Sequence, residues 1–126
     1  MLKKVIHAEA APRAVGPYSQ AIEANGFVYT AGQLPINPHT GMLISDDVAA
    51  QTRQALENIK AVLKACGLGL DAVVKTTVFL RDISDFGNVN AVYASFFNDN
   101  PPARTTVQVA ALPKGAKVEI EAIAVR

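Results

Sequence analysis

The sequence predicts a single α+β domain, residues 1–126, in which two helices cover one face of a sheet of about six strands. Half of the 126 residues are apolar, which is enough for one ordinary domain with its own core. Two segments carry apolar residues at three- and four-residue steps, as amphipathic helices do. Several short runs of β-branched or alternating residues, bounded by Gly, Pro and Asn, are typical of strands.

The first part of the chain is expected to form three strands. Their predicted ranges are 3–7, 18–24 and 27–31. The Gly16-Pro17 step favours extended or turn geometry between the first two strands. Asn25-Gly26 predicts a tight hairpin between the second and third strands, because both positions tolerate positive φ. Residues 35–41 are expected to form a loop.

The first helix is predicted from an apolar stripe that runs from Val48 to Cys66. Ser45 or Asp46 can cap its start by accepting a backbone N–H, and Gly67 can end it as a left-handed cap. Because Cys66 lies on the stripe, we expect it to be a small core residue without a catalytic role.

The second part of the chain is expected to contain a buried strand, the second helix and two closing strands. The predicted strand ranges are 73–80, 103–110 and 117–125. The helix should open at Ser84 or Asp85 and end before Asn100-Pro101-Pro102, with inner residues Phe86, Val89, Tyr93, Phe96 and Phe97. The two closing strands are expected to form a hairpin with its turn near Pro113.

Two helices can cover only one face of such a sheet, so the other face needs an explanation. Side chains alternate across a strand, so each closing strand has one set of residues that includes polar side chains. In the strand 103–110 this set is Arg104, Thr106 and Gln108, and in the strand 117–125 it is Glu119, Glu121, Ile123 and Val125. We expect both sets on the uncovered face and the alternate apolar sets toward the helices. A solvated face would be polar throughout, so Ile123 and Val125 predict a covering second copy of the chain. Arg104 and Glu119 would then lie at the edge of an interface, where clefts form.

Composition excludes several classes of protein. The net charge of +1 with scattered Lys and Arg argues against a nucleic-acid binder. No segment is apolar enough to span a membrane or to act as a secretory signal, so a cytoplasmic protein is expected. One cysteine permits no internal disulfide, and the two histidines, His7 and His39, are too far apart in sequence to suggest a metal site.

Several motifs resemble those of the RidA/YjgF family of reactive-intermediate deaminases. They are Gly-Pro-Tyr-Ser-Gln-Ala at 16–21, Ala-Gly-Gln-Leu-Pro at 31–35, Lys-Thr-Thr-Val-Phe at 75–79, the segment 85–97, Pro-Ala-Arg-Thr-Thr-Val at 102–107 and Val-Glu-Ile at 118–120. They span essentially the whole chain in the family's order. The resemblance implies a chorismate-mutase-like fold. It also implies a homotrimer with helices outside, a barrel-like core of packed sheets and three clefts between subunits.

The resemblance further implies hydrolysis of reactive 2-imino and enamine acids, such as 2-aminoacrylate and 2-iminobutyrate, to 2-keto acids and ammonia. Pyridoxal-phosphate-dependent dehydratases release such compounds and are therefore implied functional partners. The resemblance implies no cofactor and no metal. The alternative function is a module that binds or senses a small keto acid without turnover.

Three residues are expected to carry the chemistry. Arg104 can bind the substrate carboxylate, because a guanidinium holds a carboxylate through two parallel hydrogen bonds. Glu119 can orient or deprotonate the attacking water, or pass a proton to the leaving ammonia. Tyr18 can help close the cleft or hydrogen-bond water. The structural alternative is an ion pair of Arg104 with Glu119 or Glu121 at an interface.

Four more residues are expected around the substrate. Gly32 would let the backbone approach the ligand, and the resemblance places Asn90 of the second helix toward the site. Phe86 could form a wall of the pocket. Thr106 stands where some family members carry cysteine, and its backbone N–H could hold the carboxylate. The structural alternatives are a strand-end turn for Gly32, a surface position for Asn90 and core packing for Phe86.

Overall fold

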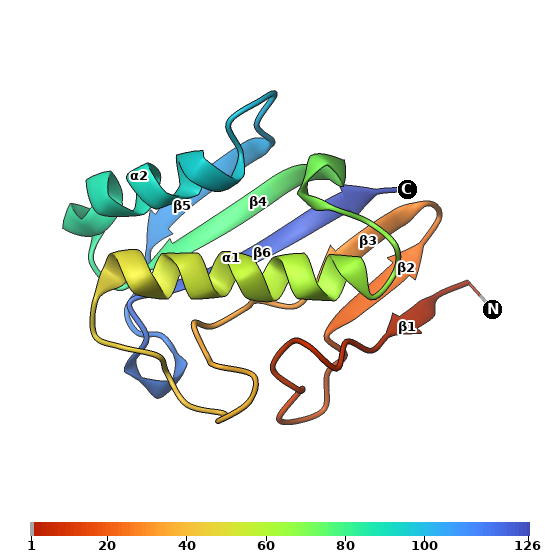
Figure 1. Cartoon of the computed structure of the whole chain (residues 1–126), viewed down its shortest axis with the longest axis horizontal. Helices are drawn as coiled ribbons and strands as arrows, with labels where there is room; N and C mark the ends of the chain where they lie inside the picture. Colours follow the sequence, from red (N-terminus) through yellow and green to blue (C-terminus); the bar gives the residue numbers. More distant parts are fainter. Residues whose placement is uncertain (1) are drawn as a thin grey trace.

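One mixed sheet of six strands carries two helices, as shown in Figure 1. The computed structural model describes residues 2–126. The strands are β1 Lys4–Ile6, β2 Ala21–Ala24, β3 Phe27–Thr30, β4 Val73–Leu80, β5 Ala103–Gln108 and β6 Val118–Val125, and the helices are α1 Val48–Lys64 and α2 Phe86–Phe96. The order in the sheet is β1-β2-β3-β6-β4-β5, and only β4 and β5 run parallel. The predicted α+β class is confirmed.

Both helices lie on the same face of the sheet (Figure 1). The stripe predicted on α1 points into the core, which holds its fully buried Leu56, Ile59 and Leu63. Every second residue of β6, from Val118 to Ala124, is buried against this layer, as the alternation predicts. Cys66 is partly buried against the same core. None of the helices formed by residues 2–126 is long and apolar enough to cross a membrane.

The start of α1 differs from the prediction. Asp47, rather than Ser45 or Asp46, caps the helix, and its carboxylate accepts the backbone N–H of Ala50 at 2.9 Å. Ser45 instead accepts the N–H of Asp47 at 2.9 Å and so shapes the loop that precedes the helix. The predicted left-handed stop is confirmed, because Gly67 has a φ of 80°. β4 has its predicted bounds, and the ends of the other strands differ from theirs by at most three residues.

The closing strands do not form the predicted hairpin. β4 lies between them, parallel to β5 and antiparallel to β6. The segment β4–α2–β5 is a strand–helix–strand unit, and its crossover places β5 parallel to β4 along one edge of that strand. Residues 109–117 then lead the chain past the end of β4, where the N–H of Val109 bonds to the carbonyl of Leu80 at 2.9 Å. β6 therefore takes the free edge of β4.

The predicted faces are right for β6 and wrong for β5. Glu119 and Glu121 lie on the uncovered face, opposite the buried residues of β6. Arg104, however, pairs in register with Thr76 of β4, which is buried beneath the helices, so Arg104 also points to the helix side. The physical reason is a tertiary contact: α2 offers two aromatic rings over this edge strand, and a guanidinium packs well on aromatic rings.

The uncovered face is substantially apolar, as expected. Its exposed large apolar side chains come from four strands and are Val5, Phe27, Tyr29, Val107 and Val125. A polar contact crosses the same face, where Lys75 donates to the hydroxyl of Thr105 at 2.8 Å. Large exposed apolar patches commonly mark interaction surfaces.

Candidate active site

A cleft of about 520 Å³ brings together three of the predicted site residues, Tyr18, Gly32 and Glu119. Glu119 reaches it from β6, and the other two come from loops that flank β2 and β3. Tyr18 is 52% exposed at the margin, where its hydroxyl accepts the backbone N–H of Val15 at 3.3 Å. The cleft therefore combines a carboxyl and a phenol from segments far apart in the sequence.

Two backbone hydrogen bonds fix the glycine loop against β6. The N–H of Gln33 donates to the carbonyl of Ile120 at 2.7 Å, and the N–H of Ile120 donates back at 3.1 Å. This pairing places Gly32 directly against the side chain of Glu119. A Cβ atom at Gly32 would overlap the carboxylate and lie 3.2 Å from the Cγ atom of Glu119. The glycine thus makes room for the carboxyl, a role that the sequence did not indicate.

The surroundings of Glu119 change its acidity. Partial burial raises the pKa of its carboxyl above the ordinary value, and the like charge of Glu121 on the same face raises the pKa further. A carboxyl with a raised pKa exchanges protons more readily near neutral pH. Glu119 therefore has the electrostatic setting of a proton-transfer group.

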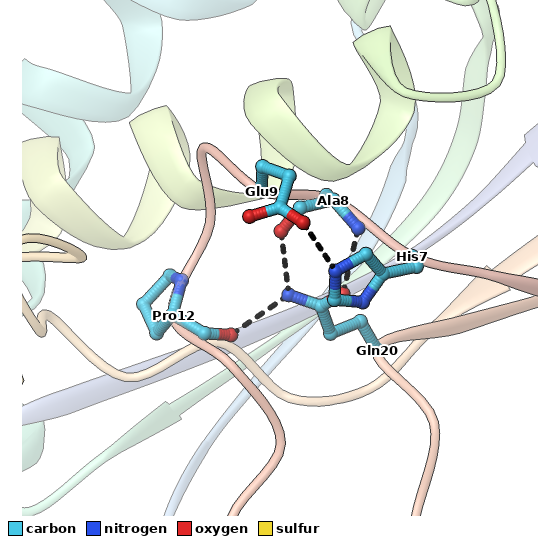
Figure 2. A network of polar contacts seen from close by, with 5 residues as sticks. All are labelled: His7, Ala8, Glu9, Pro12 and Gln20. Carbon is cyan, nitrogen blue, oxygen red and sulfur yellow. Dashed lines mark hydrogen bonds and ion pairs between the residues drawn. The ribbon is translucent and has the colours of Figure 1, made fainter.

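Gln20 fixes the loop that forms another wall of the cleft. Figure 2 shows its side chain between two backbone segments of this loop. The buried amide donates to the carbonyls of Ala8 at 3.0 Å and Pro12 at 2.9 Å, and it accepts the N–H of Ala8 at 2.7 Å. His7 and Glu9 pair nearby at 3.0 Å on the exposed side. Pro12 and Gln20 both line the cleft, so this network shapes it.

Arg104 belongs to a second group of residues on the helix side of the sheet. Its guanidinium carbon lies 4.8 Å from the ring centre of Tyr93 and 5.3 Å from that of Phe86, both on α2. No hydrogen bond or ion pair links this guanidinium to any other group within residues 2–126. The rings hold its flat faces, and its N–H donors remain free for an anion.

Two unpaired polar atoms lie in the same region. Asn90 Oδ1 and Thr106 Oγ1 are buried without a hydrogen-bond partner among residues 2–126. Asn90 stands between Phe86 and Tyr93 on one side of α2, and Thr106 follows Arg104 by two residues on β5. Buried polar atoms without partners are rare, and they commonly occur where a ligand or water belongs.

The predicted site residues therefore form two groups in one chain. The first is Tyr18, Gly32 and Glu119, and the second is Phe86, Asn90, Arg104 and Thr106. Arg104 and Glu119 lie on opposite faces of the sheet. The prediction that they share a face is therefore wrong. Sequence reasoning placed Tyr93 in the core only, although its spacing from Phe86 and Asn90 puts all three on one face of the helix. No cluster of three His, Cys, Asp or Glu side chains occurs in the described part of the chain.

Comparisons with known proteins identify the family. The model of the endoribonuclease L-PSP family matches residues 8–126. A RutC family protein of Pyrococcus horikoshii is 53% identical over 123 residues, covering 98% of both chains. The 2-iminobutanoate/2-iminopropanoate deaminase of Escherichia coli is 51% identical over 128 residues, covering 99% of both. The chain belongs to this family, the RidA/YjgF family.

Solved RidA/YjgF structures share the fold over the whole length. The crystal structure of Escherichia coli TdcF with bound serine superposes with a TM-score of 0.94 at 47% identity, covering 98% of both chains. The crystal structure of the Escherichia coli YjgF gene product superposes with a TM-score of 0.93 at 52% identity, again covering 98% of both chains, so the six-stranded sheet and its two helices are the RidA/YjgF arrangement.

Proposed function

We propose that the protein hydrolyses 2-imino and enamine acids, such as 2-aminoacrylate and 2-iminobutyrate, in a cleft that two copies of the chain complete. The observation that carries the proposal is the separation of Arg104 from Glu119. An unpaired guanidinium and a carboxyl with a raised pKa lie on opposite faces of one sheet. A small substrate that touches both groups needs Arg104 from one chain and Glu119 from another.

The proposed assembly is a homotrimer with the chorismate-mutase-like arrangement, sheets inside and helices outside. The apolar uncovered face supports it, because Phe27, Tyr29 and Val125 would leave water on association. A closed ring of three copies would contain three equivalent clefts. A cytoplasmic location is part of the proposal, since the free Cys66 suits a reducing compartment that also holds pyridoxal-phosphate-dependent dehydratases.

The proposed chemistry needs only water and proton transfer. Arg104 binds the substrate carboxylate, helped by Asn90 and the backbone N–H of Thr106. An enamine substrate first tautomerises to the imine. Glu119 takes a proton from water as the water oxygen bonds to C2, and passes it to the imine nitrogen to give a carbinolamine. Glu119 then transfers the hydroxyl proton of the carbinolamine to the same nitrogen as the C–N bond breaks and the carbonyl forms, and a 2-keto acid and ammonia leave. Tyr18 orients the water or closes the cleft.

The names of the relatives support this substrate class. The Escherichia coli relative acts, by its name, on 2-iminobutanoate and 2-iminopropanoate. Serine, the ligand in the TdcF structure, has a carboxylate and a nitrogen on C2, as a 2-imino acid does. Both point to a small acid with a C2 nitrogen as the ligand.

A mixing experiment tests the shared cleft. Arg104→Ala and Glu119→Gln chains, each inactive alone, are combined in equal amounts and allowed to exchange subunits. About a quarter of the wild-type activity should return, because random assembly gives about one site in four an intact Arg104 and an intact Glu119. Keto-acid release from dehydratase-generated 2-iminobutyrate, measured above spontaneous hydrolysis, reports the activity. Mixed trimers without activity would contradict a shared site.

The second candidate function is a module that binds a small acid without turnover, and the serine bound to TdcF is the observation that favours it. The wild-type protein distinguishes the two. A deaminase accelerates keto-acid release, whereas a binding module binds 2-ketobutyrate but leaves the spontaneous rate unchanged.

The like charge beside Glu119 leads to a pH prediction. Glu121→Gln removes one of the two causes that raise the Glu119 pKa, so the pKa of Glu119 should fall. Glu119 would then be ionised at lower pH, and the acid limb of the kcat/KM profile should move to lower pH. The shift should be partial, because burial, the larger cause, remains. Glu57→Gln is the control, because Glu57 is an exposed carboxyl on α1. This variant should leave the acid limb of the kcat/KM profile in place.

A further inference from the structure

We propose that Tyr93, anchored by Thr76, is a positioning residue that holds the guanidinium of Arg104 ready for a carboxylate. This inference deepens the proposed function and rests on it, because it takes Arg104 as the carboxylate-binding residue. Neither Tyr93 nor Thr76 needs to touch the substrate. Their effect would be exerted through the ring on which Arg104 lies.

Tyr93 is fixed from several sides. Its side chain is only 6% exposed, and its hydroxyl oxygen lies 2.7 Å from the Oγ1 atom of Thr76, which is 1% exposed. The ring of Phe97 packs against it with 4.8 Å between the ring centres. Burial raises the pKa of the Tyr93 phenol, so the group stays neutral and keeps its hydrogen bond over the working pH range. The ring therefore offers a rigid surface.

The anchor is located where it can act on Arg104. Thr76 of β4 and Arg104 of β5 are register partners in the parallel pair, so they stand side by side on the same face of the sheet. The hydrogen bond between Thr76 and Tyr93 links the sheet to α2 at this point. It sets the height and tilt of the ring over which the guanidinium lies, 4.8 Å from the ring centre.

An aromatic support suits an anion-binding arginine better than an acidic partner does. A carboxylate neighbour would occupy the N–H donors and compete with the substrate. A ring holds the flat face of the guanidinium and leaves its N–H edge free. The two rings differ, since Phe86 is 38% exposed and has no polar anchor, whereas Tyr93 is buried and tied to the sheet. Tyr93 is therefore the fixed support.

The test removes the anchor and keeps the ring. Tyr93→Phe deletes only the hydroxyl, and Thr76→Val deletes its partner without changing the shape. Each should weaken 2-ketobutyrate binding in calorimetry and raise KM about five- to tenfold with little change in kcat, as losing one hydrogen bond would. The double variant should be no worse than either single one. Thr76→Ser, which restores the hydroxyl, should bind as wild type.

Two comparisons separate positioning from a general loss of structure. In an Arg104→Ala background, Tyr93→Phe should have no further effect on binding, because no guanidinium remains to be positioned. Thr52→Val is the matched control: Thr52 is equally buried and its hydroxyl donates to Val48 at 2.8 Å, but it lies on α1. This variant should bind as wild type.

The outcomes distinguish this inference from the function on which it rests. If Arg104→Ala weakens binding while Tyr93→Phe and Thr76→Val bind as wild type, the anchor does not position Arg104. An effect of Tyr93→Phe that persists without the guanidinium would also overturn the inference. If Arg104→Ala itself binds and turns over normally, the proposed function fails first. Circular dichroism and Tm show that each variant is folded.

Discussion

Arg104→Ala is expected to lower kcat/KM for 2-iminobutyrate by about 1.5 to 3.7 orders of magnitude, since losing one partner of a desolvated charge pair costs about 2–5 kcal/mol. The guanidinium has no hydrogen-bonding partner within residues 2–126, so the substrate would be the group that loses its contact. Arg104→Lys should recover little, because an ammonium keeps the charge but cannot form the parallel pair of hydrogen bonds. Binding of 2-ketobutyrate should weaken in parallel, measured by calorimetry.

The chain offers a matched control for this substitution. Arg53 of α1 also lies over an aromatic ring, 5.7 Å from the ring centre of Phe96, but at an exposed position of that helix. Arg53→Ala removes the same kind of stacked guanidinium without approaching Arg104. It should keep wild-type turnover and binding. An Arg104→Ala protein that hydrolyses imines as fast as the wild type would show that Arg104 is not the carboxylate-binding group.

The sequence predicted best what depends on neighbouring residues. The stripe of α1 and the alternation of β6 are periodic patterns of strongly apolar residues, and both keep their predicted orientation. The left-handed stop at Gly67 is similarly local. Such patterns also fixed the number of layers, because two amphipathic helices cannot cover both faces of six strands.

The pairing and orientation of β5 could not be obtained in this way. Its residues alternate between small and polar types, so no face is clearly apolar and the pattern hardly distinguishes the two orientations. Val107 suggested an inward face, yet it is 38% exposed on the uncovered side. The orientation follows instead from long-range contacts, namely the parallel register with β4 and the rings of α2 above Arg104.

The same limit applies to the candidate site. Motifs pointed to Glu119, Gly32 and Tyr18, which line one cleft, and to Arg104, which lies across the sheet from Glu119. The separation of Arg104 from Glu119 depends on which strands pair in the folded chain, and in which register. Tyr93 was placed in the core because its spacing fits the inner helix face, and the proposed second role rests on its tertiary contacts with Thr76 and Arg104. A tyrosine in an otherwise apolar stripe is the signal that could have pointed to it.

Glu119→Gln is expected to reduce turnover by about two to four orders of magnitude, the usual contribution of general acid–base catalysis. Binding of 2-ketobutyrate should remain, because the amide has nearly the same shape as the carboxyl. The same variant should be more stable than the wild type at neutral pH. Burial and the charge of Glu121 raise the Glu119 pKa in the folded chain, so ionising this carboxyl costs more there than in the unfolded chain.

The sign of the pH dependence follows from that difference. Below the unfolded pKa, Glu119 is protonated in both states and the folded chain bears no penalty. As pH rises through the raised folded pKa, the penalty develops and then stays constant. The Tm of Glu119→Gln should therefore exceed that of the wild type at pH 7 and approach it near pH 4. Thermal unfolding at a series of pH values measures this difference.

Glu121→Gln separates electrostatic relief from chemistry. It removes the same like-charge repulsion from the same face of β6, so it should also stabilise the fold at neutral pH while retaining turnover. Only Glu119→Gln should combine higher stability with lost turnover, the trade-off expected where a functional group occupies an unfavourable setting. Wild-type turnover in Glu119→Gln would exclude this carboxyl as the proton-transfer group. An unchanged Tm at every pH would show that the fold bears no cost for its charge.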